Sequence, residues 1–203
     1  MNLYYSRGAC SLAVRIVIHE IGLPCDFESV DLKTKKTEKG EDFLKINPKG
    51  AVPVLIVEEN NAVLTENAVI QQYLADKHHA IQLLSPIGDF KRYRILEWLN
   101  YVSTELHKNC SALFNPAINE ELKNTLFKPI LKNKINFVDH ALGNNTYLCG
   151  DDFTLPDAYL FVILLWLKNF NMKLDQWDNI SRYFENLKTR PSVQKSLAEE
   201  NIK

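Results

Sequence analysis

The residue best suited to chemistry is Cys10, because the sequence places it between a turn and a helix. Residues 3–5 predict a short strand, residues 6–9 predict a turn, and residues from Ser11 onward carry apolar side chains at helical spacing. A thiol at a helix start lies near unpaired N–H groups and the positive end of the helix dipole, which favour the thiolate and lower the cysteine pKa. A buried structural cysteine is the alternative, and cysteine statistics alone support it equally well.

Two segments further along the chain could bind a polar ligand. Val52 and Pro53 follow a turn, and a proline at the start of a strand is a candidate for a cis peptide bond. Glu66 and Asn67 begin a helical pattern over residues 68–77, whose first N–H groups could bind a carboxylate. The same two residues could equally do no more than start the helix.

A third group of polar residues lies on one face of a long helical pattern. Asn100, Thr104 and His107 are spaced at i, i+4 and i+7 along an amphipathic segment that begins at Phe90. A lone histidine on a helix is usually a surface or core residue. The two polar neighbours on the same face favour a functional role for His107.

These residues fall in two parts of the chain that differ in composition. Residues 1–80 predict β-α-β, a charged stretch that forms a loop or short helix, and then β-β-α, and residues 81–89 have the Pro and Gly content of a linker. Residues 90–203 predict almost only helices. The predicted fold class is therefore α/β plus all-α, with an N-terminal domain over 1–80 and a helical C-terminal domain over 90–203.

Two features organise the helical part. Pro129 is expected to kink or divide the helical pattern over residues 122–142. Thr154 and Asp157 resemble a capping box that begins a helix over residues 158–170. Because this helix is apolar on all sides, we expect it to be the buried centre of the second domain.

Composition and charge exclude several function classes. The chain has 203 residues, of which 46% are hydrophobic, and its 24 Lys and Arg residues balance 25 Asp and Glu residues to a formal net charge of −1. No basic patch with interleaved aromatic residues is present, so we expect no nucleic-acid partner. The longest apolar run, residues 158–167, is about half the ~20 residues of a membrane helix, and no signal-peptide pattern is present. We therefore expect a soluble cytoplasmic protein that does not contact a membrane.

The cysteines do not form a disulfide framework. Cys10, Cys25, Cys110 and Cys149 are widely spaced and form no Cys-x-x-Cys motif. Free thiols in a reducing compartment fit this pattern best. The spacings of the cysteines and histidines match no zinc site, so we expect no metal.

The motifs along the chain resemble those of the glutathione S-transferase family, and most closely its bacterial beta class. They occur in the family's order and cover nearly the whole sequence. The motifs are Leu-Tyr-Tyr-Ser and Gly-Ala-Cys-Ser-Leu within residues 3–12, Asn-Pro-Lys-Gly and Val-Pro within 47–53, Leu-Thr-Glu-Asn over 64–67, Glu-Trp-Leu-Asn-Tyr and Glu-Leu-His-Lys within 97–108, and Asp-Ala-Tyr-Leu over 157–160.

The resemblance implies a thioredoxin-like N-terminal domain, an all-helical C-terminal domain and a homodimer with one site per subunit. It implies a cytoplasmic transferase that uses glutathione as co-substrate and contains no metal. The implied reaction is attack of the glutathione thiolate on a small hydrophobic electrophile, which is a detoxification reaction.

The resemblance also implies roles for individual residues. Cys10 would lie at the glutathione sulfur as a catalytic residue, together with His107. Glutathione-binding roles are implied for Lys35, Val52, Pro53, Glu66, Asn67, Asn100, Thr104 and Glu105, and a second-substrate pocket between the domains would include Tyr5, Arg7, Ser11, Cys110 and Phe114. Lys35 could instead belong to a solvated charge run, and Asn100 and Glu105 could instead serve the subunit interface.

Within glutathione, the resemblance assigns each end of the tripeptide. The backbone of Val52 would pair with the cysteinyl part like a short added strand. Glu66 would bind the γ-glutamyl ammonium, and the helix N-terminus at Asn67 would bind the γ-glutamyl carboxylate.

Two other functions stay open at this point. Cys10 stands where other classes have Tyr or Ser, and a cysteine can form a mixed disulfide with glutathione, so a thiol-disulfide transferase or peroxidase is the first alternative. The second is a non-catalytic module with the same fold that binds a ligand or a partner protein. The match at Val52, Pro53, Glu66 and Asn67 favours retained glutathione binding.

Overall fold

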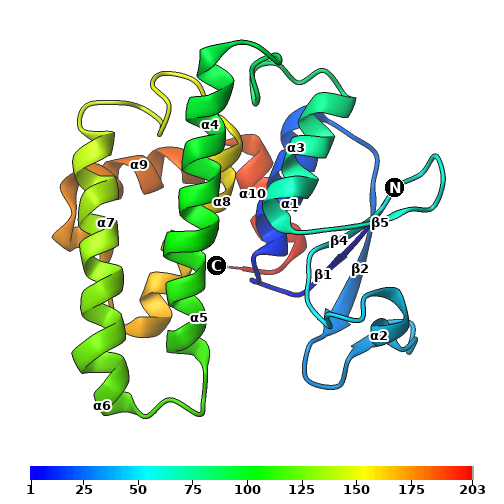
Figure 1. The fold of residues 1–203 in the computed structure, drawn as a ribbon, viewed down its shortest axis with the longest axis horizontal. Helices are drawn as coiled ribbons and strands as arrows, with labels where there is room; N and C mark the ends of the chain where they lie inside the picture. Colours follow the sequence, from blue (N-terminus) through cyan, green and yellow to red (C-terminus); the bar gives the residue numbers. More distant parts are fainter. Residues whose placement is uncertain (203) are drawn as a thin grey trace. The chain divides into compact units, whose positions relative to one another are not determined.

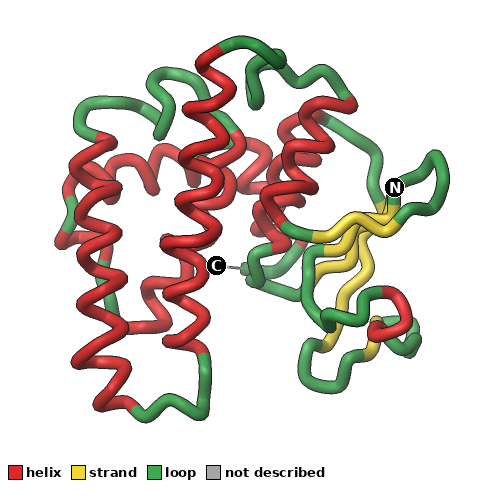
Figure 2. Tube along the Cα trace, viewed as in Figure 1, coloured by secondary structure: helices red, strands yellow, loops and turns green. Residues whose placement is uncertain are grey.

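The computed structural model describes residues 1–202, which form two compact units. The first unit contains Met1–Ala80 together with the described residues from Arg190 onward, and the second is Ile81–Thr189. The five-stranded sheet belongs to the first unit, whereas the second is built from helices and loops (Figure 2).

The sheet of the first unit is mixed. Its strands are β1 (Asn2–Tyr5), β2 (Asp26–Asp31), β3 (Lys36–Thr37), β4 (Val54–Ile56) and β5 (Val63–Thr65), in the order β3-β2-β1-β4-β5. β1 is parallel to β2, and the other pairs are antiparallel. The predicted order of elements is confirmed, and β3 adds a short strand within the stretch that was expected to be a charged loop or short helix.

Successive side chains of a strand point to opposite faces of the sheet. In this sheet, side chains on both faces are buried. Tyr4 and Val54 are paired across the ladder, and both join a buried cluster with Phe43 of helix α2 (Phe43–Ile46). Leu3 and Leu55 form the next pair and are fully buried on the other face. Figure 1 shows α1 (Ser11–Ile21) and α3 (Asn67–Lys77) packed side by side in this unit.

Helix α10 (Pro191–Glu199) packs along α1 and so belongs to the first unit (Figure 1). The sequence-based division differs here, since it assigned all of residues 90–203 to the helical domain. The physical reason lies in Arg15, which is only 2% exposed and pairs with Glu199 and Glu200 at the end of α10. These ion pairs and the buried Val193 hold α10 against α1.

The second unit consists of helices joined by loops. Its elements are α4 (Phe90–Tyr101), a π-helical segment (Val102–His107), α5 (Lys108–Phe114), α6 (Glu120–Leu122), a second π-helical segment (Lys123–Phe127), α7 (Lys128–Leu142), α8 (Leu155–Leu167), two short 3₁₀ turns (Lys168–Phe170 and Leu174–Gln176) and α9 (Asp178–Lys188). The long amphipathic helix is confirmed and extends to Phe114. Pro129 is the second residue of α7, directly after the π-helical segment Lys123–Phe127. The helical run from Glu120 to Leu142 continues through it, so the expected division at Pro129 is not found, and the run changes there from π-helical to α-helical.

Helix α8 is the buried centre of the second unit, as predicted. All but one of its residues are buried, and Thr154 and Asp157 form the expected capping box. Asp157 is fully buried and also accepts hydrogen bonds from the Leu148 N–H and the Tyr183 hydroxyl. Among the described helices, none is both long enough and apolar enough to cross a membrane.

Candidate active site

Cys10 lies immediately before α1, and its side chain is 8% exposed. Its Sγ donates to the Val52 carbonyl oxygen at 3.4 Å, and its own carbonyl oxygen accepts a 2.6 Å hydrogen bond from the Asn67 side chain. Burial raises the pKa of Cys10 to about 11, although the Asn67 amide and the N–H groups at the helix start act to lower it. The expectation of a lowered pKa is therefore wrong in this structure, because removal of the thiolate from water outweighs the helix N-terminus.

The turn before Cys10 is fixed by its own residues. Ser11 Oγ accepts from the Ser6 N–H at 3.2 Å and donates to the Ser6 carbonyl oxygen at 3.3 Å. Gly8 has φ +68°, a left-handed conformation that glycine adopts without the steric penalty of a Cβ atom. The hydroxyl of Ser11, one residue after Cys10, therefore closes the turn that leads into Cys10.

Three residues of this segment were expected to line the second-substrate pocket. Ser11 is fully buried, and its hydroxyl is engaged by the turn. Tyr5 is partly exposed, with its ring centroid 4.3 Å from the guanidinium carbon of Arg15. Arg7 is exposed and donates to the Asn201 carbonyl oxygen. Tyr5 and Arg7 therefore reach the surface of the turn, and Ser11 lies beneath it.

Val52, Pro53 and Lys35 come together at the start of β4. The Val52–Pro53 peptide bond is cis, the conformation for which the sequence made it a candidate. The carbonyl group of Val52 faces Cys10, and no hydrogen-bond partner for its N–H is found among the described residues. The Lys35 ammonium donates to the Gly50 carbonyl oxygen at 2.8 Å. Lys35 is partly buried and contacts the segment that leads to Val52, whereas Lys33 and Lys36 are exposed.

The N-terminus of α3 adjoins Cys10 through Asn67. Asn67 is 6% exposed, and its side-chain oxygen accepts from Gln71, so its amide group is used within the protein. Glu66 is exposed and has φ +72°, a strained conformation of the kind found at ligand-binding positions. Its carboxylate lies 2.7 Å from the Lys49 ammonium. A carboxylate, an ammonium group and a helix N-terminus are therefore close together, and they can bind groups of opposite charge.

In the second unit, His107 ends the first π-helical segment, a kind of turn that often occurs at functional sites. Its Nδ1 atom is hydrogen-bonded to the Tyr159 hydroxyl, and its ring centroid lies 5.0 Å from that of Trp166. Burial, with a smaller contribution from Lys108, lowers the pKa of His107 to about 4. The imidazole is therefore neutral at pH 7, and its Nε2 atom can donate or accept a hydrogen bond, depending on which ring nitrogen carries the proton.

Phe114 and Cys110 lie further along the same helical run and differ in exposure. Phe114 is 47% exposed and packs edge-on against Trp166 and Phe170, with centroid separations of 5.3 Å and 4.7 Å. Cys110 is fully buried, and burial raises its pKa to about 12. Phe114 can contact an apolar ligand directly, whereas Cys110 belongs to the interior of the unit.

The remaining predicted site residues on this helical run have other partners than His107. Asn100 and Thr104 are exposed, and the Thr104 hydroxyl donates to the Asn100 carbonyl oxygen at 3.1 Å. Glu105 forms an ion pair with Lys134. Within the described part of the chain, no hydrogen bond joins these residues to His107.

Sequence reasoning missed Lys49, Gln71 and Tyr159. Lys49 and Tyr159 stand inside the motifs that carry the family resemblance, so those motifs could have pointed to them. Gln71 is spaced i+4 from Asn67 on α3, and that spacing was a usable signal. Residues 1–202 contain no group of three or more His, Cys, Asp or Glu side chains arranged to hold a metal ion.

Comparison with known proteins decides what this arrangement is. Residues 1–76 match the glutathione S-transferase N-terminal domain, and residues 101–191 match the glutathione S-transferase C-terminal domain. The chain belongs to the glutathione S-transferase family. The predicted family, its fold and its enzyme class are thereby confirmed.

The similarity to known glutathione S-transferases extends over the whole chain. Glutathione S-transferase GstA of Escherichia coli O157:H7 is 41% identical over 203 residues, which is all of both chains. The structure of a sphingomonad glutathione S-transferase complexed with glutathione has a TM-score of 0.94 at 35% identity, and so does that of a bacterial beta class enzyme of Sphingomonas chungbukensis. Each comparison covers 100% of both chains. The match to beta class enzymes agrees with the class that the sequence motifs resemble.

Proposed function

We propose that this glutathione S-transferase binds glutathione with its sulfur beside Cys10 and transfers it to a hydrophobic electrophile. The observation that supports the proposal best is the convergence of two segments on Cys10. The Val52 carbonyl oxygen lies 3.4 Å from its Sγ, and the Asn67 amide lies 2.6 Å from its carbonyl oxygen. The glutathione bound in the sphingomonad relative supports the same co-substrate.

The groups around Cys10 suit the parts of glutathione. We assign the γ-glutamyl ammonium to Glu66 and its carboxylate to the N–H groups at the start of α3. The Val52 backbone would pair with the cysteinyl unit as an added strand. Lys35, 2.8 Å from the Gly50 carbonyl oxygen, is a cation near that strand and would attract the glycyl carboxylate.

Cys10 would act as a hydrogen-bond donor and not as a nucleophile. With its pKa raised to about 11, its thiol stays protonated at pH 7. On glutathione binding, the single thiol proton, which is donated to the Val52 carbonyl oxygen in this structure, would turn to the glutathione sulfur. This hydrogen bond would favour the glutathione thiolate, which then forms the new bond to carbon. Disulfide exchange through Cys10 needs the Cys10 thiolate, so the raised pKa argues against the thiol-transfer alternative.

We assign contact with the electrophile to Tyr5, Arg7, His107 and Phe114. The partly exposed Tyr5 and Phe114 provide aromatic surface, which suits a hydrophobic substrate. Arg7 and the neutral His107 provide hydrogen bonds that could orient the substrate or its leaving group. Ser11 and Cys110 are too deeply buried for direct contact with a ligand, so we assign neither of them to the electrophile.

We also propose that the enzyme is a cytoplasmic homodimer with a detoxification role. Its four free cysteines suit a reducing compartment. Phe90, Tyr93 and Phe137 of the second unit are each more than half exposed, and a second copy covering these rings would remove apolar surface from water. Sedimentation of the wild-type chain and of a Phe137→Glu variant tests the dimer, since the added charge should favour the monomer.

The direct test of the function is the rate of conjugation of glutathione to an activated aryl chloride. The wild-type enzyme should accelerate it, and Cys10→Ala should lower kcat/KM by about tenfold, the effect expected from loss of one hydrogen bond to a charged group. Cys25→Ala serves as the control. No acceleration by the wild-type enzyme would contradict the proposal, and disulfide reduction that depends on Cys10 would favour the thiol-transfer alternative.

A further inference from the structure

We propose that Glu200 is a positioning residue for Cys10 and acts through the backbone of Gly8. The functional consequence rests on the proposed role of Cys10. The hydrogen bond between Glu200 and Gly8 does not depend on that role, because it joins the residue after α10 to the turn before α1 whether or not a ligand is bound. Neither the sequence motifs nor the family comparison draws attention to Glu200.

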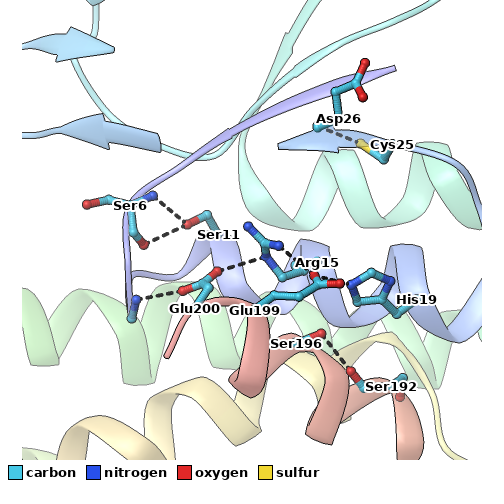
Figure 3. Close-up of polar contacts among 11 residues, drawn as sticks. Ser6, Ser11, Arg15, His19, Cys25, Asp26, Ser192, Ser196, Glu199 and Glu200 are labelled. Atoms are coloured by element: carbon cyan, nitrogen blue, oxygen red, sulfur yellow. Dashed lines mark hydrogen bonds and ion pairs between the residues drawn. The ribbon is translucent and has the colours of Figure 1, made fainter. Parts of the chain in front are cut away.

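The carboxylate of Glu200 divides its two oxygens between two segments of the first unit. Oε2 accepts the Gly8 N–H at 2.8 Å, and Oε1 accepts Arg15 Nε at 3.1 Å. The side chain is buried, with the residue 2% exposed. Figure 3 shows Glu200 reaching from the end of α10 toward Arg15 and toward the turn that the Ser6–Ser11 hydrogen bonds close.

Arg15 makes this buried carboxylate possible. A buried charge is stable only when it is paired and hydrogen-bonded, and Arg15 supplies a cation that is itself 2% exposed. The guanidinium carbon lies 4.3 Å from the ring centroid of Tyr5 and 3.8 Å from that of Phe27. Because two aromatic rings hold Arg15, the position of the Glu200 carboxylate is also fixed.

The contact with Gly8 lies two residues before Cys10. At that point the backbone is left-handed, at φ +68°, and leads directly into the start of α1. Ser11 closes the turn from within, and Asn67 holds the carbonyl of Cys10. Glu200 restrains the middle of the turn from outside. Arg7, the residue before Gly8, adds a second link to the same C-terminal segment through the Asn201 carbonyl oxygen.

The neighbouring Glu199 provides a matched control. It also pairs with Arg15, at 2.8 Å, and with His19, at 2.7 Å (Figure 3). Its side chain is 34% exposed, and its hydrogen bonds go to α1 and not to the turn. Removing Glu199 therefore tests the docking of α10 on α1, whereas removing Glu200 also removes the hydrogen bond to the Gly8 N–H.

The experiment is alkylation of Cys10 by iodoacetamide in the full chain, without glutathione, with the modified cysteine located by peptide mass. Glu200→Ala should raise the rate at Cys10 by about tenfold, as expected for local opening of a turn that has lost one hydrogen bond to a charged group. Glu200→Gln, which has one amide oxygen to replace two acceptors, should raise it by about threefold. Glu199→Ala should stay within about twofold of the wild-type rate, and Cys110 should react equally in all four proteins.

Equal rates at Cys10 in the Glu200 and Glu199 variants, or a parallel rise at Cys110, would overturn the proposal, because either result would assign Glu200 to general stability alone. If Glu200→Ala does not fold, Glu200→Gln against Glu199→Ala decides in the same way. The readout requires no glutathione. A wild-type enzyme that fails to bind or conjugate glutathione would refute the proposed function and leave this result standing.

Discussion

At Cys10, burial and the helix N-terminus act on the pKa in opposite directions, and burial is the stronger effect. Since the pKa is raised to about 11, only about one molecule in ten thousand carries the Cys10 thiolate at pH 7. The alkylation rate of Cys10 should therefore rise steadily with pH and show no plateau below about pH 9. A cysteine-containing peptide with the usual thiol pKa is the control, and an inflection below about pH 8 for Cys10 would contradict this account.

His107 should make the protein less stable in mild acid. Its pKa is about 4 in the folded protein and 6.5 in the reference state, so the unfolded chain binds a proton first as the pH falls. Stability from this group is therefore complete above pH 6.5 and is lost as the pH falls toward 4. Between about pH 6.5 and pH 5, the free energy of unfolding should fall by about 1.5 kcal/mol more in the wild type than in His107→Gln.

Urea unfolding at a series of pH values measures this difference. His140→Gln is the matched control, because His140 lies exposed on α7 of the same unit. It should follow the wild-type curve. Identical pH dependence in the wild type and His107→Gln would show that His107 is not held neutral by burial.

Individual residues show what a sequence can and cannot reveal about a site. The positions of Cys10, Val52 and Glu66 could be predicted because turns, prolines and helix starts are local signals. The pKa of Cys10 could not be predicted from the sequence, because the burial of the thiol depends on how the segments around Val52 and Asn67 fold over it. The side-chain role of Asn67 was also hidden, since its bond to the Cys10 carbonyl spans 57 residues.

Among the elements, α8 gives the sharpest stability prediction. Thr154 is fully buried, and its hydroxyl and N–H both donate to Asp157 at 2.8 Å. Thr154→Ala should lower the free energy of unfolding by about 1–2 kcal/mol, whereas Thr154→Ser keeps the hydroxyl and should lose less. Urea unfolding measures both, with the exposed Thr125→Ala as control. A Thr154→Ala protein as stable as Thr125→Ala would contradict the role of the capping box.

Long elements with strong patterns could be predicted, and short or irregular ones could not. The apolar surface of α8 and the spacing from Phe90 onward identify helices of the second unit directly. The two π-helical segments could not be predicted, because they depend on hydrogen-bond register within a continuous helix. Strand β3 has only two residues, and its pairing with β2 depends on a turn with a left-handed Lys35.

For the whole molecule, the change from mixed α/β to all-helical composition predicted two parts, but not where the last helix packs. The pattern of α10 shows that it is a helix and does not show its partner. That partner is decided by pairs far apart in the sequence, such as Arg15 with Glu199 and Glu200, and Glu20 with Ser192. Such pairs leave no local signal.

The central claim is that glutathione binds beside Cys10 with its γ-glutamyl end at Glu66, and calorimetric titration with reduced glutathione tests it most directly. The wild-type enzyme should bind glutathione saturably, and Glu66→Ala should weaken binding by about tenfold or more, since it removes the carboxylate assigned to the ammonium group. Glu59→Ala, an exposed glutamate on the same unit, should stay within about twofold of wild type. No binding by the wild type at millimolar glutathione, or equal affinities for the wild type and Glu66→Ala, would contradict the account.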